Sequence, residues 1–264
     1  MGIIPLTKNI FFILHKYMIY HRLKTLSYFL FIFPLIGLSQ DSYKNTYNGE
    51  KIVHSRYSLS YIENHEQAEW VYYKLDSRLL KGITKRSNNF RSDPKIISGS
   101  AKVSDYRKSG YDRGHLAPAG DMKSSQRAMS ESFFMSNMSP QMPSFNRGGW
   151  KKLESLVRFW AKDSEVHIVT GGILNKSLSK IGSSGVSVPD YFYKIIFDTY
   201  ECKMIGFVMP NKKITLELQS YVKTIDEIEK LTGIDFFYNL EDHLEDDLES
   251  SININSWTFK NNIE

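Results

Sequence analysis

Cysteine is almost absent from this chain: Cys202 is the only one among 264 residues. A single thiol cannot form a disulfide within the chain, and no cysteine spacing of the kind that holds structural zinc exists. The fold must therefore depend on its apolar core, and 41% apolar residues are enough for one sizeable domain but few for two. Any bound metal would need oxygen or histidine ligands.

Acidic residues are absent from positions 1–39, which hold four basic ones: Lys8, Lys16, Arg22 and Lys24. From Met18, a short basic stretch precedes an apolar run over residues 25–38, with small residues at Gly37 and Ser39. This order is typical of a secretory signal peptide, and the run is shorter than the roughly 20 apolar residues of a membrane-spanning helix. We expect residues 1–39 to be a signal peptide, with Met18 as an alternative start, although an uncleaved membrane anchor would share the pattern. The chain would then be exported, periplasmic or secreted, without stable membrane association after cleavage.

Charge is distributed unevenly along the chain, whose formal net charge is +5. Residues 40–224 hold 28 basic and 18 acidic residues, whereas residues 225–264 hold two basic and 11 acidic ones. A basic body suits a polyanionic partner. The acidic C-terminal part is interpreted as a solvated helical face.

The apolar pattern outlines one domain. Alternation and β-branched or aromatic residues predict strands over residues 57–61, 69–75, 166–169, 191–197 and 203–208. Apolar residues three and four apart predict helices over residues 124–134, 146–161 and 216–231. Pro140 and Pro143 exclude a helix and a central strand, so residues 137–143 should form a loop. We expect a flexible leader over residues 40–56 and a single domain over residues 57–264.

The motif with the clearest chemistry is Asp112-Arg113-Gly114-His115. An imidazole can take a proton from water near neutral pH, and a guanidinium offers a planar fork of donors that matches phosphate oxygens. Gly114 would let the backbone turn sharply between them. This is the equipment of a phosphodiester-cleaving site, although the same four residues could form a surface ion pair beside a structural histidine.

The helix predicted over residues 146–161 places two polar side chains on one side. Asn146 stands near its N-terminus and Glu154 lies eight residues later. At 100° per residue the two side chains are about 80° apart around the axis and two turns apart along it. Both can therefore face the strand that carries His115.

Further short sequence blocks lie along the chain between Tyr57 and Phe237. They are Glu69–Lys74, Ser136–Gln141, Phe145–Glu154, Val166–Gly172, Val188–Lys194, Gly206–Asn211 and Thr232–Phe237. With the Asp-Arg-Gly-His motif, these blocks resemble the DNA/RNA non-specific endonuclease family, the ββα-metal nucleases. The resemblance implies an α+β fold with a mainly antiparallel central sheet flanked by helices and a ββα-metal active-site motif. It also implies a metal-dependent endonuclease that hydrolyses DNA and RNA with little sequence specificity and leaves 5′-phosphate ends.

The resemblance also assigns the central roles. His115 would be the general base that deprotonates the attacking water. Asn146 would be the single protein ligand of Mg²⁺, with Mn²⁺ as an alternative ion, and a neutral amide with waters suits Mg²⁺. Glu154 would hold the metal-bound waters.

The remaining assignments concern the substrate and the orientation of the site. Arg113 would contact the phosphate, and Asp112 would orient its neighbours. Asn137 would position the water or the imidazole. Arg86, from a basic loop over residues 79–98 that also holds Arg91, and Arg147 are candidates for further phosphate contacts.

Two other functions stay open at this point. One is a secreted nucleic-acid-binding protein with a decayed nuclease site, which would bind without cleaving. The other is a toxin nuclease with an inhibitor protein as partner. A homodimer is compatible with the resemblance, although no interface stands out in the sequence.

The histidines outside the motif are expected to be structural. His54, His65 and His243 lie in polar surroundings and should be exposed. His167 lies in a predicted strand and should be packed.

Overall fold

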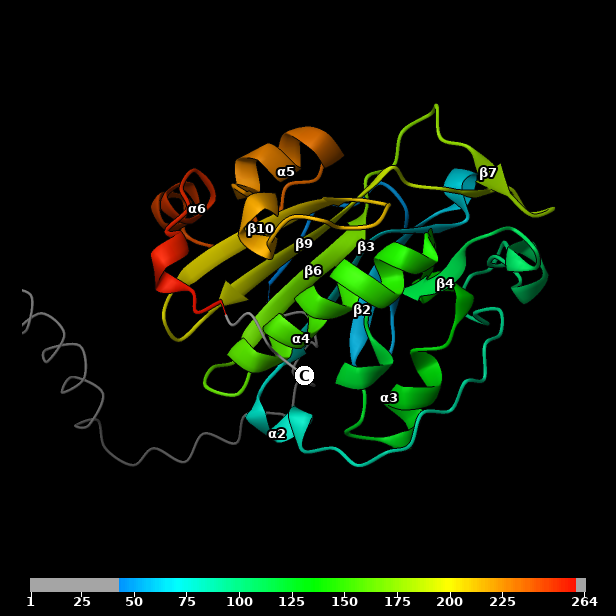
Figure 1. Cartoon of the computed structure of the whole chain (residues 1–264), viewed down its shortest axis with the longest axis horizontal. Helices are drawn as coiled ribbons and strands as arrows, with labels where there is room; N and C mark the ends of the chain where they lie inside the picture. The colour runs from blue at the N-terminus through cyan, green and yellow to red at the C-terminus, as the bar shows by residue number, and fades with distance from the viewer. Residues whose placement is uncertain (1–42, 260–264) are drawn as a thin grey trace, which may run out of the picture. The chain divides into compact units, whose positions relative to one another are not determined.

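The computed structural model describes residues 43–259 (Figure 1), so the predicted signal peptide lies outside the described residues. A seven-stranded sheet of order β1-β2-β3-β6-β9-β10-β11 forms the centre, and every neighbouring pair is antiparallel. Its strands are β1 (Glu50–Val53), β2 (Tyr57–Ile62), β3 (Gln67–Leu75), β6 (Val166–Gly172), β9 (Tyr191–Asp198), β10 (Lys203–Pro210) and β11 (Val222–Lys223). The predicted α+β class with a mainly antiparallel sheet is confirmed. Among the described residues, no helix is both long and apolar enough to cross a membrane.

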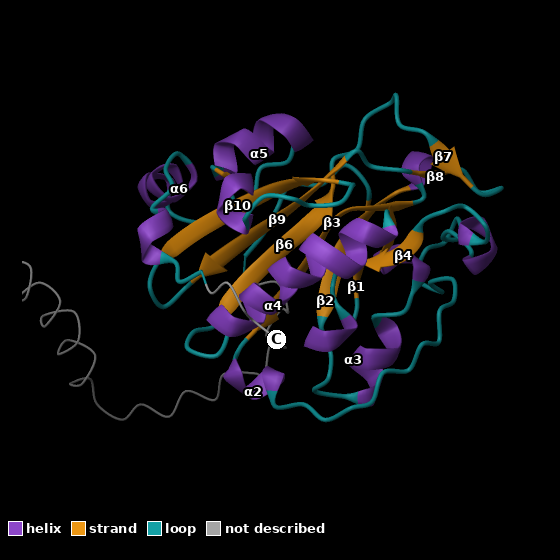
Figure 2. Cartoon of the chain, in the orientation of Figure 1, coloured by secondary structure: helices purple, strands orange, loops and turns teal. Residues whose placement is uncertain are grey.

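The two faces of the sheet carry separate apolar clusters, because successive side chains of a strand point to opposite sides. On β9, Phe192 and Ile196 join the cluster that includes the buried face of helix α4 (Lys151–Trp160). Ile195 and Phe197 instead join the cluster of helix α5 (Ile225–Thr232). Figure 2 shows α4 in front of the long strands, with α5 and helix α6 (Asp242–Glu249) beside one another on another part of the sheet.

The chain makes one long excursion between two neighbouring strands. β3 and β6 pair directly, with Leu75 opposite Val166, yet 90 residues separate these two positions. The excursion contains α2 (Ser77–Leu80), η2 (Val103–Tyr106), β4 (Asp112–His115), η3 (Ala119–Asp121), α3 (Gln126–Glu131), η4 (Met135–Asn137), β5 (Met138–Gln141), η5 (Phe145–Trp150) and α4. The other short elements are η1 (Glu63–His65), the β7–β8 pair (Lys180–Ile181 and Val186–Ser187), η6 (Leu218–Tyr221) and η7 (Ile254–Ser256).

The segment expected to be a flexible leader is built into the domain over its described part. β1 adds an edge strand to β2, and the carbonyl oxygen of Thr46 accepts a 2.9 Å hydrogen bond from the Trp70 indole. Strand pairing and a partly buried hydrogen bond to the core side chain Trp70 fix this backbone, and the polar composition of the segment did not indicate either of them.

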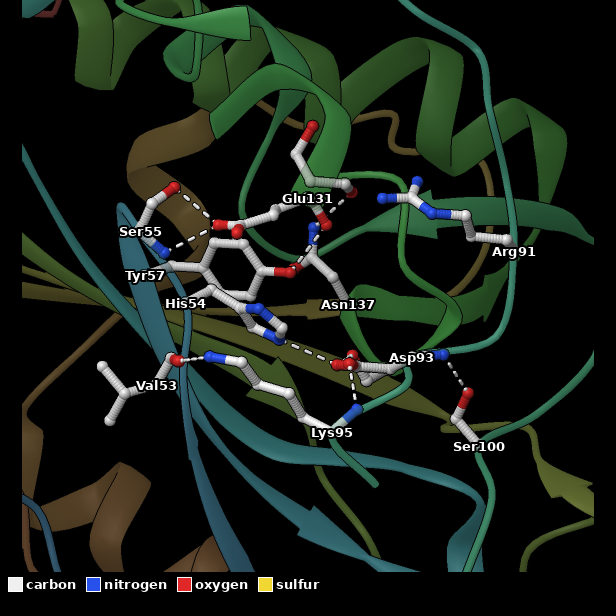
Figure 3. Close-up of polar contacts among 12 residues, drawn as sticks. Val53, His54, Ser55, Tyr57, Arg91, Asp93, Lys95, Ser100, Glu131 and Asn137 are labelled. Atoms are coloured by element: carbon white, nitrogen blue, oxygen red, sulfur yellow. Dashed lines mark hydrogen bonds and ion pairs between the residues drawn. The ribbon is translucent and has the colours of Figure 1, made fainter. Parts of the chain in front are cut away.

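His54, expected to be exposed, lies between β1 and β2 and is buried instead in a polar network (Figure 3). Its Nε2 lies 2.8 Å from an oxygen of Asp93, which also accepts a 2.5 Å hydrogen bond from Ser136. The backbone N–H of Ser55 donates to the Glu131 carboxylate at 2.7 Å. His54 and Ser136 both form hydrogen bonds with the Asp93 carboxylate and not with each other. A catalytic triad needs the histidine to contact the serine hydroxyl, so these three residues connect three segments of the chain and do not activate a nucleophile.

The helix predicted over residues 216–231 begins later, at Ile225. Thr224 caps it by accepting from the N–H of Glu227, whose side chain accepts in return from the N–H of Thr224. This reciprocal cap fixes the start, and the preceding residues form η6 and β11. Gly233 ends the helix with a φ of 70°, as its position predicts.

Candidate active site

The Asp-Arg-Gly-His motif forms strand β4, which pairs with β5. The predicted loop over residues 137–143 is therefore wrong at β5, where Pro140 lies opposite Arg113. A two-stranded sheet tolerates proline because its strands have a free edge. The sharp backbone turn expected at Gly114 is also wrong, because Gly114 lies inside β4. A Cβ there would lie 2.2 Å from the side chain of Gln141, so the strand needs glycine for space.

A cavity of about 530 Å³ opens over β4, η5 and α4. Its walls are Arg86, Arg113, His115, Pro118, Ala119, Gly120, Asn146, Arg147, Lys151, Glu154 and Arg158. Five of these side chains are basic and one is acidic, so the cavity attracts anions. The structure thus brings together six of the residues expected from the sequence: His115, Asn146, Glu154, Arg113, Arg86 and Arg147.

Two aromatic rings seat the imidazole of His115. Phe133 contacts it edge to face with ring centroids 4.9 Å apart, and Phe90 does so at 5.8 Å. Its Nε2 is buried and has no hydrogen-bond partner among residues 43–259. Burial, and then the charges of Arg86 and Arg113, lower the pKa of His115 to about 3. The imidazole is therefore neutral at physiological pH and can accept a proton.

The same two rings hold two of the arginines. The guanidinium of Arg113 lies 4.1 Å from the centroid of Phe90, and that of Arg86 lies 4.8 Å from the centroid of Phe133. Such cation–π contacts orient a guanidinium while leaving its N–H groups free to donate. Arg91 of the same loop is placed differently, because it stacks on Phe134 and donates to the carbonyl of Ser130 at 2.9 Å.

Asp112 fixes the amide of Asn146. The carboxylate accepts a 2.9 Å hydrogen bond from the Nδ2 of Asn146 and two more, at 2.8 and 2.6 Å, from Arg147. Since a carboxylate can only accept here, the amide nitrogen must face it and the amide oxygen is the atom left for a cation. The donor set thus fits a hard divalent ion held by one neutral oxygen and waters, and the hydrogen bond to Asp112 holds the amide in that orientation.

The first turn of α4 carries the acidic wall of the cavity. Glu154 lies 4.0 Å from Arg158, which in turn donates to the buried carboxylate of Asp121 at 2.7 Å. The hydroxyl of Tyr73 donates to the other oxygen of Asp121 at 3.1 Å. Burial raises the pKa of Glu154, although Arg158, Lys194 and Arg86 oppose that rise.

Lys194 is a fully buried cation beneath this wall. Its ammonium lies 4.7 Å from the centroid of the Trp150 ring and has no hydrogen-bond partner among the described residues. Burial lowers the pKa of Lys194, while the charges of Glu154 and Asp121 favour its protonated form. The Glu154 carboxylate therefore interacts with the charges of both Arg158 and Lys194.

Asn137 lies outside the cavity. Its side chain accepts from the N–H of Ala117 at 2.9 Å and donates to the carbonyls of Ala117 and Ser132 at 2.9 and 2.8 Å. Both polar atoms of the Asn137 amide therefore form hydrogen bonds with backbone groups. Neither atom is left to bind a catalytic water. Asn137 can position the imidazole only through the backbone that follows His115.

Replacing Asn137 by alanine is expected to lower the free energy of unfolding by about 2–4 kcal/mol, because three buried hydrogen bonds are lost and backbone groups are left unpaired. Urea denaturation followed by circular dichroism measures this. Asn64, which is exposed, is the control, and its alanine variant should unfold like the wild type. Equal stability of the two variants would contradict a structural role for Asn137.

Four side chains in or beside the cavity were not predicted from the sequence to belong to the site. Arg158 lies four residues after Glu154 and shares its helical face, so the spacing could have indicated it. Lys151 lies in the same helix. Phe90 and Phe133 carry no comparable signal, because aromatic residues in a loop and at the end of a helix are ordinary core candidates.

Comparisons with known proteins agree with this geometry. A model of the family described as DNA/RNA non-specific endonuclease matches residues 38–243. A nuclease of Nostoc sp. is 34% identical over 216 residues, 76% of this chain and 78% of that protein. The mitochondrial endonuclease G of Homo sapiens is 32% identical over 202 residues, 70% of this chain and 68% of that protein.

One solved structure is similar over most of the domain. A chain in the crystal structure of the EndoG/EndoGI complex has 30% sequence identity and a TM-score of 0.68, over 74% of this chain and 88% of that one. The sequence motif, the basic cavity and these relatives lead to one assignment. This chain belongs to the DNA/RNA non-specific endonuclease family, a class of metal-dependent nucleases.

Proposed function

We propose that this protein is an exported, Mg²⁺-dependent endonuclease that cleaves DNA and RNA with little sequence preference and leaves 5′-phosphate ends. The observation that carries the proposal is the cavity itself, which places a neutral imidazole, an oriented amide oxygen and five basic side chains around one space. A basic, water-accessible cavity binds the phosphodiester backbone, which is common to all sequences.

The protein residues divide the work on a phosphodiester. Arg113 and Arg86 hold the phosphate oxygens from the aromatic rings on which they stack. The Nε2 of His115, which has no other partner in the described part of the chain, takes the proton of the attacking water. Bound Mg²⁺ supplies positive charge that stabilises the transition state and the leaving oxygen.

Asn146 and Glu154 hold the cation and its waters in this proposal. Asn146 offers its amide oxygen because Asp112 binds the amide nitrogen. Glu154 would accept from metal-bound waters in its ionised form, which burial disfavours and the charges of Arg158 and Lys194 favour. Arg147 and Lys151 extend the positive surface at the mouth of the cavity.

Export rests on the basic and apolar order of residues 1–39. An inhibitor protein is a further proposed partner, since the similar EndoG chain was crystallised with EndoGI in work on EndoG inhibition. Such a partner would need an acidic surface to face the basic cavity.

The test of the main proposal is degradation of plasmid DNA and of RNA by the purified protein, with Mg²⁺ and with EDTA. We expect both polymers to be cut only in Mg²⁺. Binding without cleavage under every divalent ion would instead favour the decayed nuclease site. End-labelling of the products reports the position of the phosphate.

Changing Asp112 to alanine should raise the Mg²⁺ concentration for half-maximal rate about 10–100-fold, because the amide of Asn146 loses its orienting partner. Rate measured against Mg²⁺ concentration gives this value. Changing Arg147, which is exposed and shares the same carboxylate, to alanine is the control and should shift it much less. An unchanged Mg²⁺ requirement in the Asp112 variant would remove the orienting role.

A further inference from the structure

A second acidic group lies apart from the cavity, on the face of the sheet opposite α4. Asp226 and Glu229 belong to α5, and Glu249 is the last residue of α6. Each offers one carboxylate oxygen, and these three oxygens all lie within 4.8 Å of one another. Figure 1 shows the two helices next to each other, away from α4 and β4.

Glu249 is the unusual member of this group. It is only 6% exposed, and its Oε1 is buried without a hydrogen-bond partner among the described residues. A buried carboxylate oxygen normally has a donor or a cation as partner. Its neighbours in the group are two more carboxylates, which can only repel it when charged. Within the described residues, this group of three carboxylates therefore lacks the positive charge that would stabilise it.

Among residues 43–259, no ion pair involves Asp226, Glu229 or Glu249. Glu229 is already oriented, because one of its oxygens accepts a 2.8 Å hydrogen bond from the N–H of Phe236.

We propose that Asp226, Glu229 and Glu249 form a Ca²⁺ site that joins α6 to α5. Three carboxylates are hard oxygen donors, whereas zinc favours histidine and cysteine, and Mg²⁺ keeps most of its waters. Ca²⁺ binds oxygens at about 2.3–2.6 Å, so two ligands on opposite sides of the ion lie about 4.8 Å apart. Waters complete the coordination on the open side formed by the two half-buried residues.

This site is distinct from the nuclease site in position and in chemistry. Glu249 lies beyond residue 243, where the match to the endonuclease family ends. The ligands are separated from the catalytic cavity by the sheet, because α5 packs on the cluster of Ile195 and Phe197 and α4 packs on the opposite face. Its effect is to hold the C-terminal helix on the domain and so to raise the stability of that part of the fold.

The test is titration of the purified protein with CaCl₂ in saturating MgCl₂, so that the catalytic site is already filled. Isothermal calorimetry should show a Ca²⁺-binding step, and the unfolding temperature should rise with Ca²⁺. In the variant Glu249→Gln, both signals should be lost while Mg²⁺-dependent cleavage stays at the wild-type rate. Asp247→Asn removes one exposed charge from the same helix and should keep both signals.

Two further variants separate this proposal from its alternatives. Asp226→Asn, at a half-buried ligand, should also lose the Ca²⁺ step, and it decides the question if Glu249→Gln does not fold. Asn146→Ala, which disables the proposed catalytic metal site, should keep the step whether or not the nuclease proposal holds. The site is refuted if wild-type protein shows no Ca²⁺ step under these conditions, or if the step survives in both ligand variants.

Discussion

Replacing His115 by alanine is expected to reduce the rate of DNA and RNA cleavage by about 10²–10⁴-fold, the usual contribution of a general base. The imidazole is the only cavity side chain that is neutral, basic and without a partner at its Nε2 among the described residues. Affinity for nucleic acid should change little, because the five basic side chains that line the cavity remain. Turnover measured on plasmid DNA, together with a binding assay in EDTA, gives the two quantities.

A second buried histidine provides the matched control. His167 is 2% exposed, in β6, and its ring lies 2.6 Å from the Tyr72 hydroxyl and 3.2 Å from Glu165. His167→Ala should lower stability and leave the rate per folded molecule unchanged. If both variants lose activity in proportion to their loss of folded protein, His115 is not the base.

The low pKa of His115 determines how the cleavage rate depends on pH. It is lowered to about 3, first by burial and then by Arg86 and Arg113, so the free enzyme holds the base in its proton-accepting form at every pH above that value. A phosphate bound between the two arginines offsets their charges and raises the pKa of His115 toward its ordinary value. The rate should therefore not fall on the acid side until the pH approaches the pKa of the substrate-bound imidazole, which a pH profile of kcat measures.

Changing Asn146 to alanine should lower Mg²⁺-dependent cleavage by at least about 10²-fold, since the only expected protein ligand of the ion is removed. Higher Mg²⁺ should restore part of the rate if binding is what was lost. The variant Asn146→Asp keeps an oxygen ligand but sets a second carboxylate beside Asp112, from which Asn146 Nδ2 lies 2.9 Å. It should retain more metal binding than alanine while losing the fixed orientation.

Calorimetry with MgCl₂ and initial rates across Mg²⁺ concentrations decide between binding and chemistry. A variant that binds Mg²⁺ normally and still fails to cleave would assign Asn146 to the substrate instead. A variant with normal cleavage would remove it from the site.

Much of the sheet could be predicted from the sequence because its strands are long and strongly patterned. The five predicted strands all lie within β2, β3, β6, β9 and β10. The short strands could not be predicted. β5 contains Pro140, which is acceptable because β5 pairs with β4 alone among the described strands, so its other edge needs no N–H donor. β1 is only four residues long, lies in a polar stretch of the sequence and is ordered by its pairing with β2.

The site divides in the same way. Residues close in sequence, such as Asp112 to His115, or on one helical face, such as Asn146 and Glu154, could be grouped from spacing alone. Contacts between distant segments could not. The pairing of Asp112 with Arg147 and the rings that seat His115 depend on how the loops pack. The role of Asn137 is the clearest example, because its hydrogen bonds to Ala117 and Ser132 appear only in three dimensions.

The long excursion between β3 and β6 also has a consequence for how this protein folds. Every residue that lines the cavity lies in that excursion, between Leu75 and Val166. Pairing two strands across 90 intervening residues requires a slow search, although each doubling of a loop adds only about 0.6 kcal/mol to its closure. α4 ends shortly before β6 begins and carries an apolar face that packs on the sheet. Docking of α4 on the sheet would bring β6 close to β3. The helix that carries Glu154 should therefore also influence the rate at which these two strands pair and the central sheet is completed.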